Sequence, residues 1–314
     1  MDISVIIVNW NTRDILSQCL NSLRNHPASY PMEVIVVDNA SSDGSAELVR
    51  EKFPEVRLIV NKENCGFAKG NNIGIQQSSG KYVCIMNSDV LVLEDTLNRM
   101  YDYMEANPRI GILGPKFYRD MERTGIDPTS CRKFPTIWNK LCEALALHKL
   151  FPGSEFFSTP EMDYFAHDSI KKVEVIAGTT WMVRRTALDE VGLMDESFFM
   201  YGEDLDWCKR FWDHGWEVLF FPEALAIHFG RSSSSKEPVR FHLEQQRSAM
   251  RYWRKHHGIT GVFCIHAIGL LHHAIRLLGQ MILYSVKKKE RSQLAGKIVC
   301  NSRALLFYLG LPRK

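Results

Sequence analysis

The chain has 314 residues, of which 45% are hydrophobic and 24% are charged. This composition excludes a disordered or fibrous chain and leaves room for one large domain with an appendage. The net charge is only +3, but residues 229–314 hold 16 Lys and Arg against 3 Asp and Glu, which leaves 23 against 33 for residues 1–228. This asymmetry indicates that the C-terminal region meets an anionic partner, either a nucleic acid or a phospholipid surface.

The eight cysteines are scattered through the chain without a C-x-x-C pair. This pattern is typical of free thiols in a reducing compartment and argues against a structural zinc site. The N-terminal run MDISVIIVNW is short and carries Asp2 in place of a positively charged flank. We therefore predict a first strand there rather than a signal peptide.

The first 115 residues alternate between strand-like and helix-like segments. Runs of β-branched residues, typical of strands, occupy 3–10, 33–40, 56–61, 81–89 and 110–115. Apolar residues recur at helical spacing in 13–25, 43–53 and 94–107. The alternation predicts an α/β fold with a mostly parallel sheet covered by helices on both faces.

The rest of the chain is less regular at first and then helical. Residues 116–172 are rich in Pro, Gly and aromatic residues, which indicates an irregular surface segment near the side of the sheet where an acceptor substrate would bind. A strand returns in 171–185, followed by a short helix in 186–192 and a further strand in 216–230. The region beyond is helical and basic.

Ligands of such sheets bind beyond the carboxyl ends of the strands, and polar residues stand at those ends here. They are Asn9, Asn11, Asp38, Asn39, Asn61, Asn64, Asn87 and Asp89. Asp38 could belong to a helix cap, but Ser42 or Asp43 suffices for that. We therefore favour a contact from Asp38 to a pyrimidine base or ribose.

The stretch NCGFAKGNNIG carries Gly66 and lacks the G-x-G-x-x-G spacing of a dinucleotide fingerprint. Its glycines permit close backbone approach at a helix start, where N–H groups favour an anion. In MNSDV, Asp89 is either a turn residue or, with Asn87, a ligand for a hard divalent cation beside substrate phosphates.

The stretch FFMYGEDLDWCKR gathers Glu203, Asp204 and Asp206 behind large apolar side chains. Acids suit a helix N-terminus, but capping needs only one of them. A carboxylate beside aromatic rings loses hydration, which raises its pKa and its strength as a base. His228 is either a satisfied core residue or a ligand, and Arg231 either contacts phosphate or lies in a flexible RSSSS loop.

Taken in order, these pieces resemble a family-2 glycosyltransferase with a GT-A fold, over roughly residues 2–235. They are SVIIVNWN, VIVVDNASSDGS, NCGFAKGNNIGI, MNSDV, AGTTWMVRRTALDEVGLMDESFFMYGEDLDWCKR and His228. GFAKGNNIG and YGEDLDWCKR narrow the likeness to a rhamnosyltransferase-like branch, which builds bacterial cell-surface polysaccharides. We accordingly predict a catalytic domain in 1–235 and a helical, basic, membrane-associating region in 236–314.

The resemblance implies roles residue by residue. Asp204 would be the general base, and Asp89 with His228 would bind Mg²⁺ or Mn²⁺ on the donor diphosphate. Asn87 stands where the family's D-x-D motif has its first Asp, which puts the metal's identity and affinity in question. The residues that we expect at the donor nucleotide are Asn9, Asp38, Asn64, Gly66, Asn71 and Asn87. Those that we expect at the acceptor or as alternatives to Asp204 are Glu203, Asp206, Trp181 and Arg231. For Trp181, packing in the core is an equally good interpretation.

The function thus predicted is transfer of a sugar, with L-rhamnose as one candidate, from a dTDP- or UDP-linked donor to a lipid-linked or glycan acceptor, with inversion at the anomeric carbon. Two alternatives are a sugar-nucleotide nucleotidyltransferase and a non-catalytic binder of nucleic acid or an anionic surface. No Gly-rich loop with Arg follows the first strand, as the former would need. The periodicity of the tail is unlike a base-stacking groove, so we expect no nucleic-acid partner.

Residues 261–286 are long enough to cross a bilayer, for which about 20 apolar residues suffice. A polar stripe nevertheless recurs on one helix face, formed by His266, Gly269, His273, Arg276 and Gln280. We rank a helix lying in the membrane plane first, with KKKER on anionic headgroups, docking onto the catalytic domain second and a spanning helix third. The expected location is the cytoplasm, peripheral on the inner face of the cell membrane.

Overall fold

A computed structural model describes residues 1–162, 164–230 and 237–311. The chain divides into two compact units, one formed by 1–134 and 166–233 and the other by 135–165 and 234–314. The first unit therefore lacks the segment 135–165, which the predicted domain 1–235 included. This segment belongs to the second unit because its helix α5 (Ile137–Ala144) packs against α9 (Pro238–Val286).

The first unit is built on a nine-stranded sheet of order β3-β2-β1-β4-β10-β6-β11-β5, with β8 paired to β11. Its strands are β1 (Ile3–Asn9), β2 (Met32–Asp38), β3 (Arg57–Val60), β4 (Tyr82–Asn87), β5 (Val90–Val92), β6 (Ile110–Tyr118), β8 (Lys171–Lys172), β10 (Thr180–Arg184) and β11 (Glu217–His228). A separate two-stranded sheet pairs β7 (Cys131–Arg132) with β9 (Val175–Ile176).

Six strands of the large sheet run in one direction. β1 is parallel to β2 and β4, β2 to β3, and β6 to β11. β10 lies antiparallel between β4 and β6 and so restores the common direction beyond it. The α/β sheet flanked by helices is thus confirmed. The antiparallel insertion of β10 was not predicted, because a run of apolar residues encodes a strand but not its direction.

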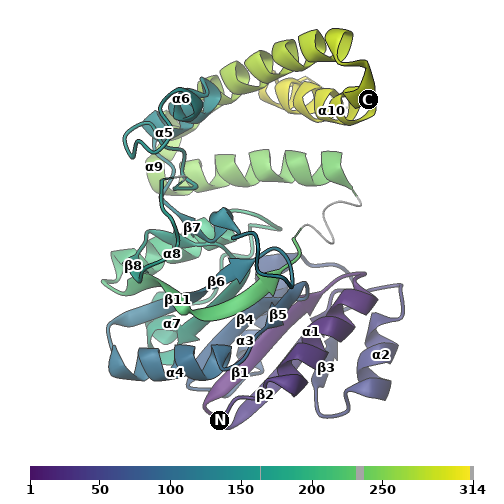
Figure 1. The fold of residues 1–314 in the computed structure, drawn as a ribbon, viewed down its shortest axis with the longest axis vertical. Coiled ribbons are helices and arrows are strands. Elements are labelled where there is room, and N and C mark those ends of the chain that lie inside the picture. The colour runs from purple at the N-terminus through teal and green to yellow at the C-terminus, as the bar shows by residue number, and fades with distance from the viewer. Residues whose placement is uncertain (163, 231–236, 312–314) are drawn as a thin grey trace. The chain divides into compact units, whose positions relative to one another are not determined.

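Two helical layers cover this sheet (Figure 1). The helices of the first unit are α1 (Arg13–Asn25), α2 (Ser45–Lys52), α3 (Phe67–Gln76), α4 (Thr96–Ala106), α7 (Arg185–Val191) and α8 (Glu203–Asp213). Alternate residues of β1 point to opposite faces. Val5 and Ile7 join a core with Leu16 of α1, whereas Ile6 packs against Gly74 of α3. The two apolar sets of β1 thereby bury a core on each side.

The second unit contains α5, α6 (Leu147–Leu150), α9 and α10 (Arg291–Tyr308). The predicted long C-terminal helical region is thus confirmed. α9 is interrupted at Gly258, whose φ of 64° is not helical, and α10 packs against α9. Among the described residues, α9 is the one helix long and apolar enough to cross a membrane by length and composition.

Candidate active site

Polar side chains join the carboxyl ends of three neighbouring strands. Asn9 at the end of β1 donates from Nδ2 to Asp38 Oδ1 at 3.0 Å and to Ser41 Oγ at 3.1 Å. The hydroxyl of Thr12 donates to Asn9 Oδ1 at 2.6 Å and lies 3.0 Å from the Ser88 hydroxyl, which follows β4. The ends of β1, β2 and β4 therefore meet in one hydrogen-bonded network, as their shared direction predicts.

Asp38 is almost fully buried within this network. Its Oδ2 accepts a hydrogen bond from the Ser41 backbone N–H at 2.9 Å, in addition to the bond from Asn9. Both carboxylate oxygens therefore hold the loop that follows β2. The predicted contact from Asp38 to the nucleotide remains a prediction.

The segment after β3 is shaped by its own polar side chains. Asn64 Oδ1 accepts from the Gly66 N–H, and the Gly66 carbonyl accepts from Asn39, both at 3.0 Å. Asn71 is buried in α3, where its Nδ2 donates to the Phe67 carbonyl at 2.9 Å. Its Oδ1 is buried and has no partner among the described residues. Asn64, Gly66 and Asn71, which we predicted at the donor nucleotide, thus stabilise the start of α3. Their contact with a ligand stays a prediction.

Asp89 and His228 lie together, although 139 residues apart in the sequence. His228 ends β11, and its Nε2 is 3.5 Å from Asp89 Oδ1. Its Nδ1 is 3.0 Å from Oδ2 of Asp127, which lies in the loop after β6. Burial would lower the pKa of His228, but the hydrogen bond to Asp127 and the charges of Asp89 and Asp127 outweigh it and raise the pKa above 6.5.

Sequence reasoning missed Asp127. In GIDPTS an Asp before a Pro is an ordinary turn residue, so no local signal marked it. A metal-binding His usually has a carboxylate hydrogen-bonded to the ring nitrogen that does not bind the metal. This bond fixes the orientation of the ring. Asp127 therefore supports His228 in the place predicted for a metal ligand.

The residues around Asp89 suit a divalent cation only in part. Asn87 Oδ1 is buried without a hydrogen-bond partner among the described residues, and Asp89 adds a carboxylate beside the imidazole of His228. Within the same residues no group of three or more His, Cys, Asp or Glu is arranged to hold a metal. Mg²⁺ and Mn²⁺ sites that use one or two carboxylates are completed by substrate phosphates. Asn87, Asp89 and His228 therefore fit a cation site that substrate phosphates complete. They do not by themselves form a complete metal site.

The acids of α8 have different surroundings. Glu203 is buried, and this burial with the charge of Asp204 raises its pKa to about 8, although Arg132 opposes the shift. Glu203 is therefore protonated at neutral pH. Asp204 forms an ion pair with Arg132 of β7 through Oδ2, and its Oδ1 accepts from the Leu205 N–H at 2.8 Å. Of these two neighbours, Asp204 is the carboxylate placed to act as a base.

Arg132 was also missed, because the stretch SCRKF carries no recognisable motif. It reaches Asp204 through the pairing of β7 with β9, which stands before β10 in the chain. The Gly178 N–H, between β9 and β10, lies 3.4 Å from Asp204 Oδ2. The next residue, Thr179, accepts from the Asn87 N–H at 2.9 Å. This short link ties Asp204 to the Asn87–Asp89 segment and brings the predicted base to the edge where the predicted metal ligands lie.

The backbone before Asp204 is held in an uncommon conformation. Tyr201 and Gly202 have φ values of 67° and 87°. A non-glycine residue in the left-handed region costs free energy and persists where the surrounding structure fixes it, most often at functional sites. The strain at Tyr201 supports a functional reading of the acidic turn beyond helix capping.

Two residues predicted at the acceptor or as alternatives to Asp204 have no support from their placement. Asp206 is fully buried and pairs with Arg210 at 3.0 Å, so it stabilises α8 and is not an alternative base. Trp181 is fully buried, donates to the Ile176 carbonyl and packs on Trp207, so it belongs to the core. Arg231 lies outside the described residues.

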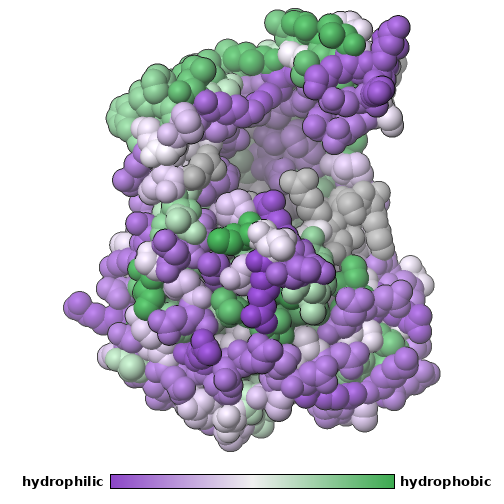
Figure 2. All heavy atoms as spheres, in the orientation of Figure 1, coloured by the Kyte–Doolittle hydropathy of each residue, from purple (hydrophilic) through white to green (hydrophobic). Residues whose placement is uncertain are grey.

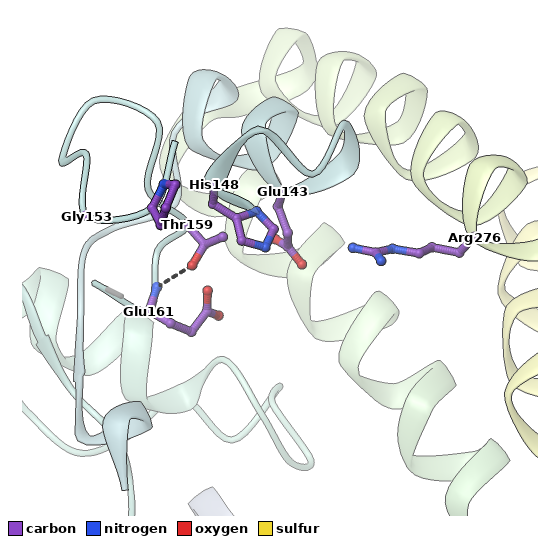
Figure 3. Close-up of a pocket in the computed structure, with 7 residues that line it drawn as sticks. Glu143, His148, Gly153, Thr159, Glu161 and Arg276 are labelled. Atoms are coloured by element: carbon purple, nitrogen blue, oxygen red, sulfur yellow. Dashed lines mark hydrogen bonds between the residues drawn. The ribbon is translucent and has the colours of Figure 1, made fainter. Parts of the chain in front are cut away.

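A separate cavity of about 450 Å³ lies within the second unit (Figure 3). Its lining combines two carboxylates, Glu143 and Glu161, with His148 and Arg276. Two carboxylates beside the single guanidinium of Arg276 argue against a simple phosphate site. None of the predicted site residues lines this cavity.

Comparison with known proteins shows the family of this chain. The model of glycosyl transferase family 2 matches residues 4–192. An N-acetylglucosaminyl-diphospho-decaprenol L-rhamnosyltransferase of Mycobacterium tuberculosis is 28% identical over 246 residues, covering 75% of this chain and 78% of its own. The rhamnosyltransferase WbbL of Escherichia coli is 26% identical over 261 residues, covering 79% and 91%.

Solved structures support the fold alone. The mannosyltransferase PcManGT from Pyrobaculum calidifontis, in complex with GDP-Man and Mn²⁺, has a TM-score of 0.54 at 16% identity, covering 96% of this chain and 84% of its own. The architecture is that of a glycosyltransferase of the GT-A type. The chain belongs to glycosyltransferase family 2, and its predicted likeness to the rhamnosyltransferase-like branch is confirmed. This membership favours sugar transfer over nucleotidyl transfer or non-catalytic binding.

Proposed function

We propose that the protein is an inverting rhamnosyltransferase of cell-surface polysaccharide synthesis, which transfers L-rhamnose from a dTDP- or UDP-linked donor. The observation that carries the proposal is the arrangement at one edge of the sheet, where Asp204 is linked through Gly178 and Thr179 to the segment of Asn87 and Asp89. The rhamnosyltransferases among the relatives support the choice of sugar.

The donor diphosphate would lie at Asn87, Asp89 and His228, which are the residues that would hold Mg²⁺ or Mn²⁺. A cation bound there stabilises the negative charge that grows on the leaving nucleoside diphosphate. The ring of His228 is held by Asp127, so its Nε2 keeps its direction toward Asp89. The neighbouring network of Asn9 and Asp38 fixes the loop on which the nucleoside would rest.

Asp204 would accept the proton of the attacking acceptor hydroxyl. As that O–H bond breaks, the oxygen bonds to the anomeric carbon and the bond to the diphosphate breaks, so a single displacement inverts the centre. Arg132 forms an ion pair with the same carboxylate and holds it in position. Glu203, whose pKa is raised to about 8 by burial, would not act as the base.

The acceptor is proposed to be a glycan on a lipid carrier, with a polyprenyl diphosphate as the model, because the mycobacterial relative is named for such a substrate. A carrier of this kind resides in a membrane. We therefore propose that the protein works in the cytoplasm, peripherally on the inner face of the cell membrane. The basic C-terminal region agrees with this location.

The test is a screen of nucleotide sugars for release of nucleoside diphosphate, with and without Mn²⁺, in the presence of a polyprenyl-diphosphate glycan. Asp204→Asn should lower transfer by roughly 10²–10⁴-fold, the contribution of a positioned general base, while the dissociation constant for dTDP or UDP stays unchanged. Asp213→Asn is the matched control, because this carboxylate is half exposed at the other end of α8.

Two results would overturn the proposal at different levels. Full transfer by Asp204→Asn would remove the base from this residue but leave the reaction. Absence of release from every nucleotide sugar, with nucleotide binding intact, would reject the transferase itself.

A further inference from the structure

The second half of α9 exposes its apolar face. Every third or fourth residue from 259 to 282 is both apolar and exposed, a set formed by Ile259, Phe263, Ala267, Leu271, Ile275, Leu278 and Ile282. Ile259 and Phe263 are 76% and 75% exposed. A helix of a water-soluble domain turns such a stripe toward its core. Here an apolar strip about 35 Å long, at 1.5 Å per residue, faces outward.

The polar stripe of the same helix is turned toward α10. His273 lies 2.8 Å from Asn301 of α10, which donates to Gln280 at 3.1 Å. Gly269 packs directly on the ring of Tyr308. These polar groups face inward because each finds its partner there and not in solvent.

The exposed strip is not the edge of a buried core, because most of the apolar part of α9 is not buried. In the most apolar 18-residue window of α9, only 22% is buried. Exposed hydrophobic side chains also lie on α5 and α6 of the same unit, namely Ile137, Trp138 and Leu150. Figure 2 shows hydrophobic residues over α5, α6 and the adjoining part of α9. A contiguous apolar surface of this kind marks an interaction site.

Charge indicates what covers this surface. Residues 238–311 hold 12 Lys and Arg against 2 Glu, and the exposed Lys287, Lys288 and Lys289 follow directly after the apolar strip. A second copy docked face to face would bring two such excesses of positive charge together, which is unfavourable. A bilayer with anionic headgroups supplies both an apolar interior and the opposite charge.

We propose that α9 and α10 form a helical hairpin that lies in one leaflet of an anionic membrane, with the strip 259–282 buried among the acyl chains and Lys287–Lys289 on the headgroups. The proposal deepens the proposed function, because it rests on the membrane location and names the surface that provides it. α9 does not span the bilayer, because a spanning helix would carry Arg276 near the bilayer centre, where a charge is costly.

The experiment is co-sedimentation of the full-length protein with phosphatidylcholine vesicles that contain no, or 30%, phosphatidylglycerol. The assay contains no sugar nucleotide, so its failure is distinguishable from failure of transfer. The triple variant Ile259→Ser, Phe263→Ser, Leu278→Ser should lose vesicle partitioning by at least on the order of 100-fold. Met121→Ser is the matched control, an exposed hydrophobic of the first unit.

A second variant keeps the test independent of the triple variant's folding. Lys288→Gln with Lys289→Gln should lower partitioning into anionic vesicles by on the order of 30-fold, since each lysine near the surface contributes about fivefold. Lys52→Gln with Lys62→Gln makes the same charge change in the first unit and should have no effect. Unchanged partitioning of both C-terminal variants would overturn the proposal. So would self-association of the wild type, without vesicle binding, that the triple variant abolishes.

Discussion

Glu203 and Asp204 are adjacent in the chain, but their carboxyl groups have different surroundings. Glu203 has a buried carboxyl group beside the charge of Asp204, which raises its pKa to about 8, whereas Asp204 has Arg132 as its partner. A difference in surroundings between two neighbouring carboxyl groups is how a site separates a proton donor from a base.

The pH dependence of stability tests the state of Glu203. Its folded pKa of about 8 lies above the ordinary 4.5, so between these values the folded protein keeps a proton that the unfolded chain loses. The contribution is fully present below about pH 4.5 and is lost as the pH rises through 8. At pH 9, Glu203→Gln should be more stable than the wild type by on the order of 2 kcal/mol, because about 1.4 kcal/mol corresponds to each pKa unit and charged buried sites relax.

The measurement is the free energy of unfolding in urea from pH 4.5 to 9. Glu47→Gln, an exposed carboxylate on α2, is the control and should follow the wild-type profile. Parallel profiles for Glu203→Gln and the wild type would mean that Glu203 is already ionised at neutral pH.

A second residue-scale prediction concerns Asp127. Asp127→Asn removes the carboxylate beside His228 Nδ1 and should weaken Mn²⁺ binding by roughly 10–100-fold, the usual effect of losing such a support. Calorimetric titration of Mn²⁺ into the complex with a nucleoside diphosphate measures it, and Glu122→Gln, exposed in the same loop, should leave the affinity unchanged. Equal Mn²⁺ affinity in the Asp127 variant would show that His228 needs no such support.

At the scale of elements, the N-terminus of α3 is locked to the segment before α8. The Phe67 N–H donates to the Phe199 carbonyl at 2.7 Å, and Asn72 donates to the Met194 carbonyl at 2.9 Å. Two segments more than 100 residues apart thus form one support behind Glu203 and Asp204. Gly66 permits it, because its φ is +87° and a Cβ there would lie 2.3 Å from the Phe199 oxygen.

Gly66→Ala should therefore destabilise the protein by about 3 kcal/mol, from backbone strain and this clash together. Gly192→Ala is the matched control, since its φ is +83° but nothing lies within 4 Å of the added Cβ. It should cost only about 1 kcal/mol, from strain. Urea midpoints give both values, and equal losses would mean that α3 shifts away from Phe199 at little cost.

At the scale of the whole molecule, charge is divided between a negative N-terminal part and a positive C-terminal part. Residues 229–314 have an excess of 13 positive charges (16 less 3), and residues 1–228 an excess of 10 negative charges (33 less 23). The same region carries the exposed apolar strip of α9. The C-terminal part of the chain therefore provides both the attraction to anionic lipid and the apolar surface that inserts. Added salt weakens only the first of these two contributions.

Raising NaCl from 0.05 to 0.5 M should lower partitioning into anionic vesicles by more than tenfold, because salt screens the headgroup charge. A residual partitioning should persist at 0.5 M, since insertion of apolar surface is not screened. Sedimentation over a salt series measures both parts. Complete release at 0.5 M would mean that the apolar strip stays out of the bilayer.

Much of the fold is accessible from local patterns. The β-branched runs and helical spacings over the first 115 residues predict β1 to β4, β6 and the helices between them, because burial of one or two faces imposes a period on the sequence. The polar residues that end the strands mark the edge of the sheet where the site lies. The acidic turn at Glu203 and Asp204 holds more carboxylates than a helix cap needs. Each of these signals lies within about ten residues.

Only the tertiary structure decided which side chains meet. His228 and Asp127 are 101 residues apart, and Arg132 and Asp204 are 72 apart, so no period connects them. The tertiary structure also placed Trp181 and Asp206 in the core, gave 135–165 to the second unit and turned the polar stripe of α9 inward. The amino-acid sequence determines which faces of an element are apolar or polar. What lies against each face depends on how the distant elements pack, because burial stabilises a pair of faces and not one face alone.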